Sequence, residues 1–137
     1  MESERAELIA FYHRYLECCN DRRFEELDEY VDQDVRVNGA PQGRDQYIAG
    51  IRAVVEAFPD YHWDLQHLLV DVDGSWLASR LIDTGTHTGT FLDVPATGRA
   101  ISAQELAIYR LDGGKIVESW GDLGSAVRDQ LTGGAPT

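Results

Sequence analysis

The sequence predicts an α+β fold in which a curved antiparallel sheet, packed by three N-terminal helices, encloses an apolar pocket. Apolar residues recur at helical spacing before Pro59, and at the alternating spacing of strands after it. The chain has 137 residues, of which 43% are hydrophobic, as expected for one globular domain. We expect residues 1–131 to form this domain and residues 132–137 to form a flexible tail.

The N-terminal part predicts three helices and one short strand. Residues Ser3–Asn20 carry apolar and aromatic side chains at i, i+3 and i+4 spacing, which is typical of an amphipathic helix. A short helix is expected at Phe24–Tyr30, followed by a short strand at Val35–Asn38. The third helix is predicted at Asp45–Phe58, because Pro59 cannot continue it.

The C-terminal part predicts a run of long antiparallel strands. Alternating patterns place them at His62–Val72, Trp76–His87, Ala100–Leu111 and Lys115–Asp122. The segment Asp112-Gly113-Gly114 joins the last two as a tight hairpin turn. A few helical residues are expected before the tail, so that helices pack on one face of a bent, cone-shaped sheet.

Charge and cysteine usage exclude several classes of protein. Twelve basic against 24 acidic residues give a net charge of −12, which disfavours binding to nucleic acid or to anionic membranes. No apolar run approaches the 20 or so residues of a membrane-spanning helix, and the Glu-rich N-terminus does not resemble a signal peptide. The adjacent Cys18 and Cys19 suit neither a structural disulfide nor a zinc site. These features predict a cytoplasmic protein.

Four sequence blocks carry a family resemblance, and their order and spacing fit it from about residue 8 to residue 131. The blocks are Phe58-Pro59-Asp60; Arg80 followed by Gly85-Thr86-His87-Thr88-Gly89-Thr90-Phe91; Pro95-Ala96-Thr97-Gly98-Arg99; and Tyr109-Arg110-Leu111-Asp112-Gly113-Gly114-Lys115-Ile116-Val117-Glu118-Ser119-Trp120. In these blocks the chain resembles the SnoaL-like polyketide cyclases of the NTF2-like superfamily. The resemblance implies a cone-shaped fold and ring closure on a polyketide ester by an intramolecular aldol reaction, in natural-product biosynthesis, without cofactor or metal.

The resemblance also implies an aspartate that acts as sole acid and base, and Asp122 is its best match. In a strand Glu118, Trp120 and Asp122 share one face, so a pocket on that face would desolvate the carboxylate and raise its pKa. The alternative is a solvated turn aspartate. His87 follows Gly85 near a strand end and could bind a carbonyl or relay a proton, or could simply bond an adjacent loop.

Three polar residues are candidates for substrate binding. Arg80 in mid-strand is expected to pair with Glu105 or Glu118, and substrate contact is the alternative. Gln104 is the one amide on its strand face, where an unbonded amide costs free energy, so a hydrogen bond to ligand or to the catalytic acid is plausible. Asn38 could orient a carbonyl or serve as a turn residue.

Aromatic side chains are candidates for the pocket walls, because flat rings stack on flat polycyclic ligands. These candidates are Tyr12, Tyr15, Tyr47, Phe58, Trp63 and Trp120, although a stripe at helical spacing is more often part of the core. No histidine has a partner at metal-ligand spacing, and neither a phosphate-binding glycine loop nor a nucleophilic serine motif occurs.

Other functions stay open on the same fold. Relatives in the superfamily act as epoxide hydrolases, dehydratases, isomerases or cofactor-independent hydroxylases, and a non-catalytic small-molecule-binding module is a further alternative. An epoxide hydrolase would need an Asp–Arg–Asp triad, for which Arg80 is present without two obvious flanking acids. We expect a small hydrophobic substrate, aromatic or polyketide-like, and a homodimer or higher homo-oligomer formed through the exposed sheet face.

Overall fold

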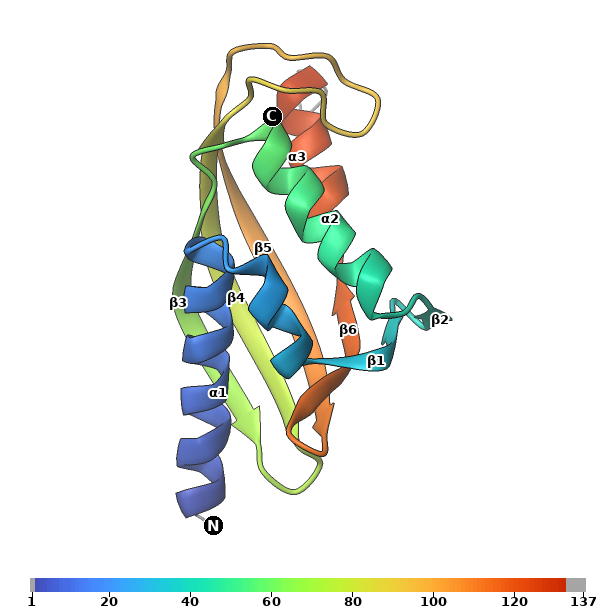
Figure 1. The fold of residues 1–137 in the computed structure, drawn as a ribbon. Coiled ribbons are helices and arrows are strands. Elements are labelled where there is room, and N and C mark those ends of the chain that lie inside the picture. Colours follow the sequence, from blue (N-terminus) through green and yellow to red (C-terminus); the bar gives the residue numbers. More distant parts are fainter. Residues whose placement is uncertain (1, 133–137) are drawn as a thin grey trace.

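The computed structural model describes residues 2–132 and has the expected α+β architecture (Figure 1). The elements in chain order are helix α1 (Glu2–Asn20), the 3-10 helix η1 (Phe24–Glu29), β1 (Val31–Val37), β2 (Ala40–Pro41), α2 (Arg44–Ala57), β3 (His62–Asp71), β4 (Trp76–Thr86), β5 (Ala100–Asp112), β6 (Lys115–Gly121) and α3 (Leu123–Thr132). Of the expected tail at 132–137, Thr132 ends α3 and the other positions lie outside the described residues.

The six strands form one sheet in the order β2-β1-β6-β5-β4-β3. The neighbours from β6 to β3 are antiparallel, as predicted, whereas β1 runs parallel to β6. The all-antiparallel prediction is therefore wrong at this pair, because η1 delivers β1 to the sheet in the same direction as the distant β6. Register shifts place extra residues in β1, β3 and β6, and such bulges bend a sheet.

The first strand is longer than predicted, because it begins at Val31 rather than at Val35. Val31 and Val35 are both fully buried, so burial extends the strand through a stretch whose aspartates suggest a turn. The strand ends at Asn38 and Gly39, which have positive φ angles of 51° and 83° and form the tight turn into β2. The C-terminal helix α3 is also longer than expected, and it buries Val127 against the sheet.

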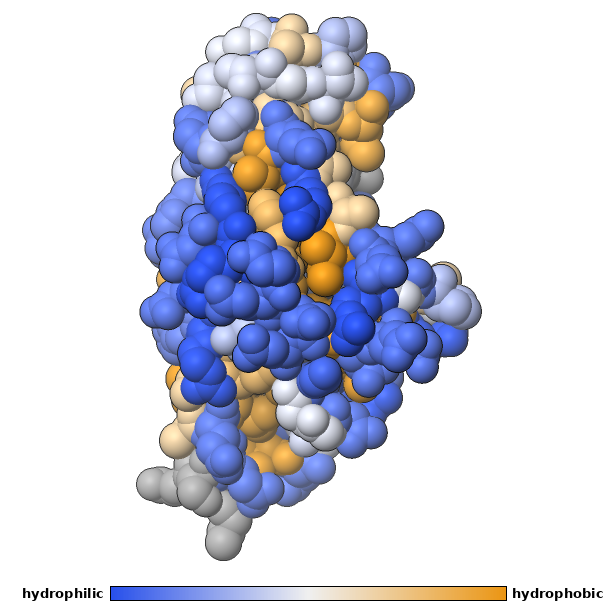
Figure 2. Space-filling view, in the orientation of Figure 1, coloured by the Kyte–Doolittle hydropathy of each residue, from blue (hydrophilic) through white to orange (hydrophobic). Residues whose placement is uncertain are grey.

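Helices α1 and α2 cover one face of the bent sheet, with η1 between them (Figure 1). On that inner face the buried side chains alternate along the strands, for example Leu77, Leu81 and Asp83 of β4. Figure 2 shows this side of the molecule, where hydrophilic side chains predominate and hydrophobic ones surface beside α2. Among the described helices, none combines the length and hydrophobicity needed to cross a membrane.

The opposite face of the sheet carries an unusual row of apolar side chains. Leu69 pairs with Ala78, Ala78 with Ile108, and Ile108 with Trp120, so the row crosses four neighbouring strands. Leu69, Ile108 and Trp120 are 70%, 46% and 41% exposed, and Leu106 beside them is 59% exposed. We refer to Leu69, Ala78, Ile108 and Trp120 as the outer apolar row.

Candidate active site

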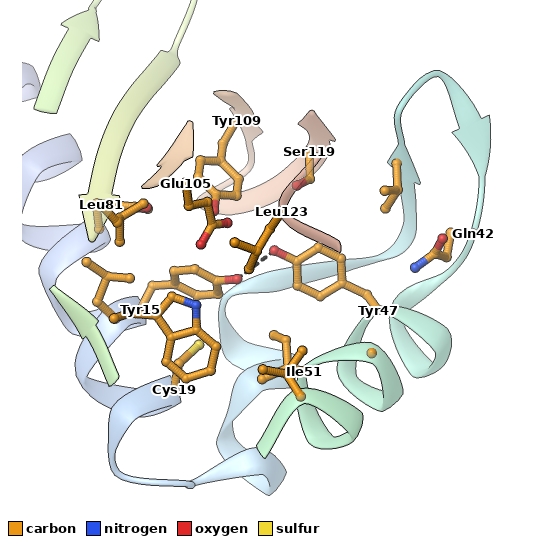
Figure 3. Close-up of a pocket in the computed structure, with 16 residues that line it drawn as sticks. Tyr15, Cys19, Gln42, Tyr47, Ile51, Leu81, Glu105, Tyr109, Ser119 and Leu123 are labelled. Carbon is orange, nitrogen blue, oxygen red and sulfur yellow. Dashed lines mark hydrogen bonds between the residues drawn. The ribbon is translucent and has the colours of Figure 1, made fainter. Parts of the chain in front are cut away.

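A cavity of about 210 Å³ lies between α1, α2 and the inner face of the sheet (Figure 3). Helices contribute most of its wall, and strands contribute its floor. The lining residues are Tyr12, Tyr15, Leu16, Cys19, Val37, Gln42, Tyr47, Gly50, Ile51, Val54, Trp63, Leu81, Glu105, Tyr109, Ser119 and Leu123. Such a mostly apolar hollow with a few convergent polar groups is typical of a small-molecule site.

Four tyrosines place hydroxyl groups in or next to the cavity. The hydroxyl oxygens of Tyr15 and Tyr47 are 2.5 Å apart, and Tyr12 is hydrogen-bonded to Ser79 at 2.7 Å. The Tyr109 ring packs against those of Tyr12 and Tyr15, with centroids 5.4 and 6.0 Å away. Burial raises the pKa of all four phenols, which therefore stay neutral and can donate hydrogen bonds.

Glu105 is the carboxyl group of this cavity. It lies on the inner face of β5 between the buried Ala103 and Ala107, and in Figure 3 it points into the cavity toward the tyrosines. Burial, followed by the neighbouring Asp83, raises the pKa of Glu105 well above its ordinary value. A carboxyl group with a raised pKa can donate a proton, and it can take one up after losing it.

Asp83 lies directly behind Glu105 on β4. Leu81 faces Glu105 and Asp83 faces Ala103 across the β4–β5 ladder, so the two acids are diagonal neighbours on one face. Asp83 is fully buried, and Tyr61 donates a 2.9 Å hydrogen bond to its Oδ2. Burial raises the pKa of Asp83, while hydrogen bonds from Glu105 and Tyr61 act in the opposite direction.

The structure brings four of the predicted wall residues together at the cavity. Tyr12, Tyr15, Tyr47 and Trp63 all line it. Trp63 is fixed at the start of β3 by Asn20, whose side chain bonds both the backbone N–H and the carbonyl of Trp63. The end of α1 and the first residues of β3 thus form one rigid side of the cavity.

The expectation that Glu118, Trp120 and Asp122 share a cavity-lining face is wrong. Ser119 lines the cavity, so its strand neighbours Glu118 and Trp120 point to the outer side of the sheet. Glu118 there forms a 2.6 Å ion pair with Arg110 and accepts a hydrogen bond from the Trp120 indole. Asp122 follows the end of β6, is exposed, and is not among the lining residues.

His87 and Phe58 lie in a separate buried cluster and do not line the cavity. The His87 ring stacks on Phe58 at 5.1 Å, and its Nδ1 accepts a hydrogen bond from the backbone N–H of Thr97. Its Nε2 is buried and has no hydrogen-bond partner among the described residues. The β4–β5 register is continuous through Gly85, so no bulge redirects the chain before His87.

Arg80 and Gln104 also lie away from the cavity, on the outer face. The Arg80 guanidinium donates a 2.7 Å hydrogen bond to Gln104 and contacts His67 at 3.4 Å. The expected partners of Arg80 are therefore wrong: Glu105 points to the opposite face and Glu118 pairs with Arg110. The amide of Gln104 satisfies this outer network instead of a ligand.

Asn38 serves as a turn residue, which is the alternative given for it above. Its Oδ1 accepts a 3.0 Å hydrogen bond from the backbone N–H of Gly121, and its own N–H bonds to the Ser119 carbonyl. It is exposed and does not line the cavity. Asn38 thus ties the β1–β2 turn to the end of β6.

Comparison with known proteins decides the family. The family model for SnoaL-like polyketide cyclases matches residues 9–128. The chain belongs to the SnoaL-like polyketide cyclase family. Among its relatives, the aklanonic acid methyl ester cyclase of Streptomyces peucetius is 25% identical, covering 79% of this chain and 78% of the relative. The nogalonic acid methyl ester cyclase of Streptomyces nogalater is 24% identical over 80% and 86% of the two chains.

Solved structures support the same family. The SnoaL-like polyketide cyclase structure from Agrobacterium tumefaciens superimposes with a TM-score of 0.79 at 31% identity, covering 90% of this chain and 97% of that one. The chain is thus an enzyme of the cyclase class on an NTF2-like, cone-shaped fold.

Sequence reasoning missed the cavity's own polar groups in this SnoaL-like chain, namely Glu105, Tyr109 and Ser119. It placed the side of β5 that carries Gln104 toward the cavity, because Leu106 and Ile108 on that side look like core residues. The signal was present in the small Ala103 and Ala107, which flank Glu105 and leave room for it on the inner face.

Proposed function

We propose that this SnoaL-like protein closes a ring on a small polyketide-like ester without a cofactor, and that Glu105 is the acid and base. The observation that supports this most is a carboxyl group, with its pKa raised by burial, at the floor of an aromatic-lined cavity. The two methyl ester cyclases among the relatives suggest the substrate class.

The chemistry is an intramolecular aldol closure. Once Glu105 has given up its own proton, it takes a proton from the acidic carbon beside a carbonyl, and the resulting enolate attacks a second carbonyl carbon. The new alkoxide then receives the proton from Glu105, so the enzyme returns to its starting state. Neutral phenols such as Tyr15 and Tyr47, which line the cavity, can donate hydrogen bonds to the enolate oxygen.

Catalytic roles for Asp122 and His87 stay predictions that compete with this assignment. Asp122 precedes Leu123, which does line the cavity, so a local movement at the start of α3 is what its carboxylate would need to reach substrate. His87 would need its Nε2 atom to meet a substrate atom from within the Phe58 cluster. Both residues therefore belong in the first set of variants.

The lining residues disfavour one alternative reaction. An epoxide hydrolase triad needs a cationic side chain between two acids, whereas no lysine or arginine occurs among the residues that line the cavity. Arg80, the candidate for that place, lies on the outer face with Gln104. Dehydration, isomerisation, cofactor-independent hydroxylation and ligand binding without turnover are separated from cyclisation by the product analysis below.

We also propose a homodimer formed through the outer apolar row and a cytoplasmic location. The row crosses four strands and exposes Leu69, Ile108 and Trp120, so its apolar surface is more extensive than that of a single exposed hydrophobic residue. A second copy of the chain can cover this surface symmetrically. The adjacent cysteines are free and buried, which supports a reducing compartment.

The decisive experiment is turnover of a panel of aromatic polyketide methyl esters, with products identified by mass and NMR. We compare wild type with Glu105→Gln, Asp122→Asn and His87→Gln, and use Glu118→Gln as a control acid on the outer face. A cyclised product that falls at least 100-fold in Glu105→Gln, and less than threefold in the control, supports the proposal. A comparable loss in Asp122→Asn alone would contradict the role of Glu105.

Rearranged, dehydrated or hydroxylated product would contradict cyclisation while retaining an enzyme. Binding of the esters without any product would contradict catalysis and identify a binding module.

A further inference from the structure

We propose that Asp83 is a positioning residue that shares a single proton with Glu105, so that two carboxyl groups act as one acid–base unit. This inference rests on the proposed function for the catalytic step, but the shared proton itself is a property of the resting protein. Asp83 does not line the cavity and therefore acts only through Glu105.

The pairing of β4 with β5 places the Asp83 and Glu105 carboxyl groups next to each other. Glu105 lies opposite Leu81, and Asp83 lies two residues further along β4, on the same inward face. Burial raises the pKa of Glu105, and the neighbouring Asp83 raises it further, as expected for two carboxyl groups that lie side by side. Two ionised carboxylates would offer each other only acceptors, so a hydrogen bond between these neighbours requires that one of them holds a proton.

Two orphaned oxygens identify where that proton lies. Among the described residues, Asp83 Oδ1 and Glu105 Oε1 are buried and have no hydrogen-bond partner. One proton between the two carboxyl groups would satisfy both atoms at once. Buried polar oxygens rarely remain unsatisfied, because leaving one unpaired costs the desolvation of the group.

Tyr61 determines which carboxyl group carries the proton at rest. Its hydroxyl donates to Asp83 Oδ2, which favours the ionised form of Asp83. Asp83 then accepts from Tyr61 on one oxygen and from Glu105 on the other, and Glu105 is the acid that faces the cavity. The buried ring of Tyr61 is held against Trp63 with centroids 4.8 Å apart, so this donor is fixed.

The charged and titratable surroundings of the pair are otherwise neutral phenols and a thiol, with one histidine at the edge. The groups that act on one or both acids are Tyr61, His62, Tyr12, Cys19 and Tyr109. His62 is exposed and lies on β3, and it acts on Asp83 only at a distance. Among the described residues that line the cavity there is no arginine or lysine to compete for the negative charge.

The pair gives the proposed reaction a balanced proton path. As Glu105 takes the proton from the substrate carbon, the proton it already holds passes to Asp83. The carbon–carbon bond forms, the alkoxide takes the proton from Glu105, and Asp83 returns its proton to Glu105. The pair begins and ends with one proton and one negative charge, and no co-reactant is consumed.

One protonation state of the pair is therefore active. A second proton on the Asp83–Glu105 pair leaves no carboxylate to act as the base. Loss of the pair's single proton leaves no acid and places two negative charges side by side. We expect kcat/KM of the wild type to follow a bell-shaped pH profile. Replacing Asp83 with Asn leaves a single carboxyl group, for which the activity rises with pH and then stays level.

The first test is infrared spectroscopy of the full chain without ligand, over a pH titration. We expect a carbonyl band of a protonated carboxylic acid that persists above pH 6 in wild type, disappears in Glu105→Gln, and moves to lower pH by at least one unit in Asp83→Asn. Absence of a protonated acid above pH 6 would overturn the shared proton, whatever the protein's reaction.

The second test is the pH profile of kcat/KM for Asp83→Asn, with Asp64→Asn as the control. Asp64 is an exposed acid on the adjacent strand β3, on the opposite side of the sheet. We expect the fall of kcat/KM at high pH to disappear in Asp83→Asn and to remain in Asp64→Asn. A bell of unchanged shape with a uniformly lower rate would show a merely structural role and overturn the proposal.

Tyr61→Phe provides an independent variant should Asp83→Asn fold poorly. Loss of the Tyr61 hydroxyl makes ionised Asp83 less stable. The rise of kcat/KM at low pH should therefore shift to higher pH, while the fall of kcat/KM at high pH remains. An unshifted ascending limb would contradict the role of Tyr61. A protein that shows the shared acid in the infrared but converts no ester would contradict the proposed function and leave the pair intact.

Discussion

The Tyr15 hydroxyl oxygen lies 2.5 Å from that of Tyr47, and this contact joins α1 to α2 across the cavity. Both rings line the cavity, and the Tyr15 ring is also packed edge-on against Tyr30 at 6.3 Å. A hydrogen bond between two phenols leaves one hydroxyl proton free to point elsewhere. That proton is available to a carbonyl oxygen bound between the helices.

The Tyr15–Tyr47 contact should be measurable as a coupling energy. We expect Tyr15→Phe and Tyr47→Phe each to lower the free energy of unfolding by about 1–2 kcal/mol, because the remaining hydroxyl group loses its partner. The double variant should lose less than the sum, with a coupling of about 0.5 kcal/mol or more. Urea denaturation of the four proteins measures it, and additive losses would show that the two hydroxyls do not stabilise each other.

The stability of the protein should fall with rising pH because of Glu105. The pKa of this group is raised in the folded state, whereas in the unfolded chain it is near ~4.3. The contribution is therefore fully present below pH ~4.3 and is lost as the pH rises through the folded-state value, with a slope of up to about 1.4 kcal/mol per pH unit. Denaturation across pH compares wild type with Glu105→Gln, and a pH-independent difference between them would contradict it.

Replacement by alanine should change the stability of the fold in opposite directions at two glycines, Gly50 and Gly89. A Cβ at Gly50 in α2 would meet no atom within 4 Å, so Gly50→Ala should stabilise the fold by about 0.5–1 kcal/mol. A Cβ at Gly89 would lie 2.8 Å from the Glu56 carbonyl oxygen, and Gly89→Ala should destabilise it by about 1–3 kcal/mol through overpacking. Thermal denaturation distinguishes them, and equal midpoints would refute this description of the α2–loop contact.

The outer apolar row should control the oligomeric state. We expect Leu69→Asp and Ile108→Asp to convert a dimer into a monomer, because each would place charge in the covered face. Thr84→Asp, on the same face but outside the row, should leave the dimer intact. Sedimentation velocity measures this, and a wild-type protein that is monomeric at micromolar concentration would refute the dimer.

Much of the fold could be predicted from periodicity, because long strands and helices bury one face each. Strands β3 to β6 begin and end within one residue of their expected bounds. The misses were local. The start of β1 and the length of α3 depend on the burial of Val31 and Val127 by partners distant in sequence, which no local pattern contains.

The site was predicted less completely than the fold. The helix aromatics Tyr12, Tyr15 and Tyr47 were found, because their helical spacing marks an inward stripe. On β5 the two faces carry similar apolar content, and alternation alone does not say which one faces the helices. The outer Gln104 was therefore chosen, and the inner Glu105 was treated only as a partner for Arg80.

The sequence by itself determined the α+β class, the family resemblance and the aromatic wall, since each follows from residue types at a local spacing. The tertiary structure decided which acid the cavity holds. Asp83 and Glu105 are 22 positions apart in the chain and meet only because antiparallel pairing places Leu81 opposite Glu105. Their burial, and hence their shared proton, arises from that pairing and from the helices that cover it.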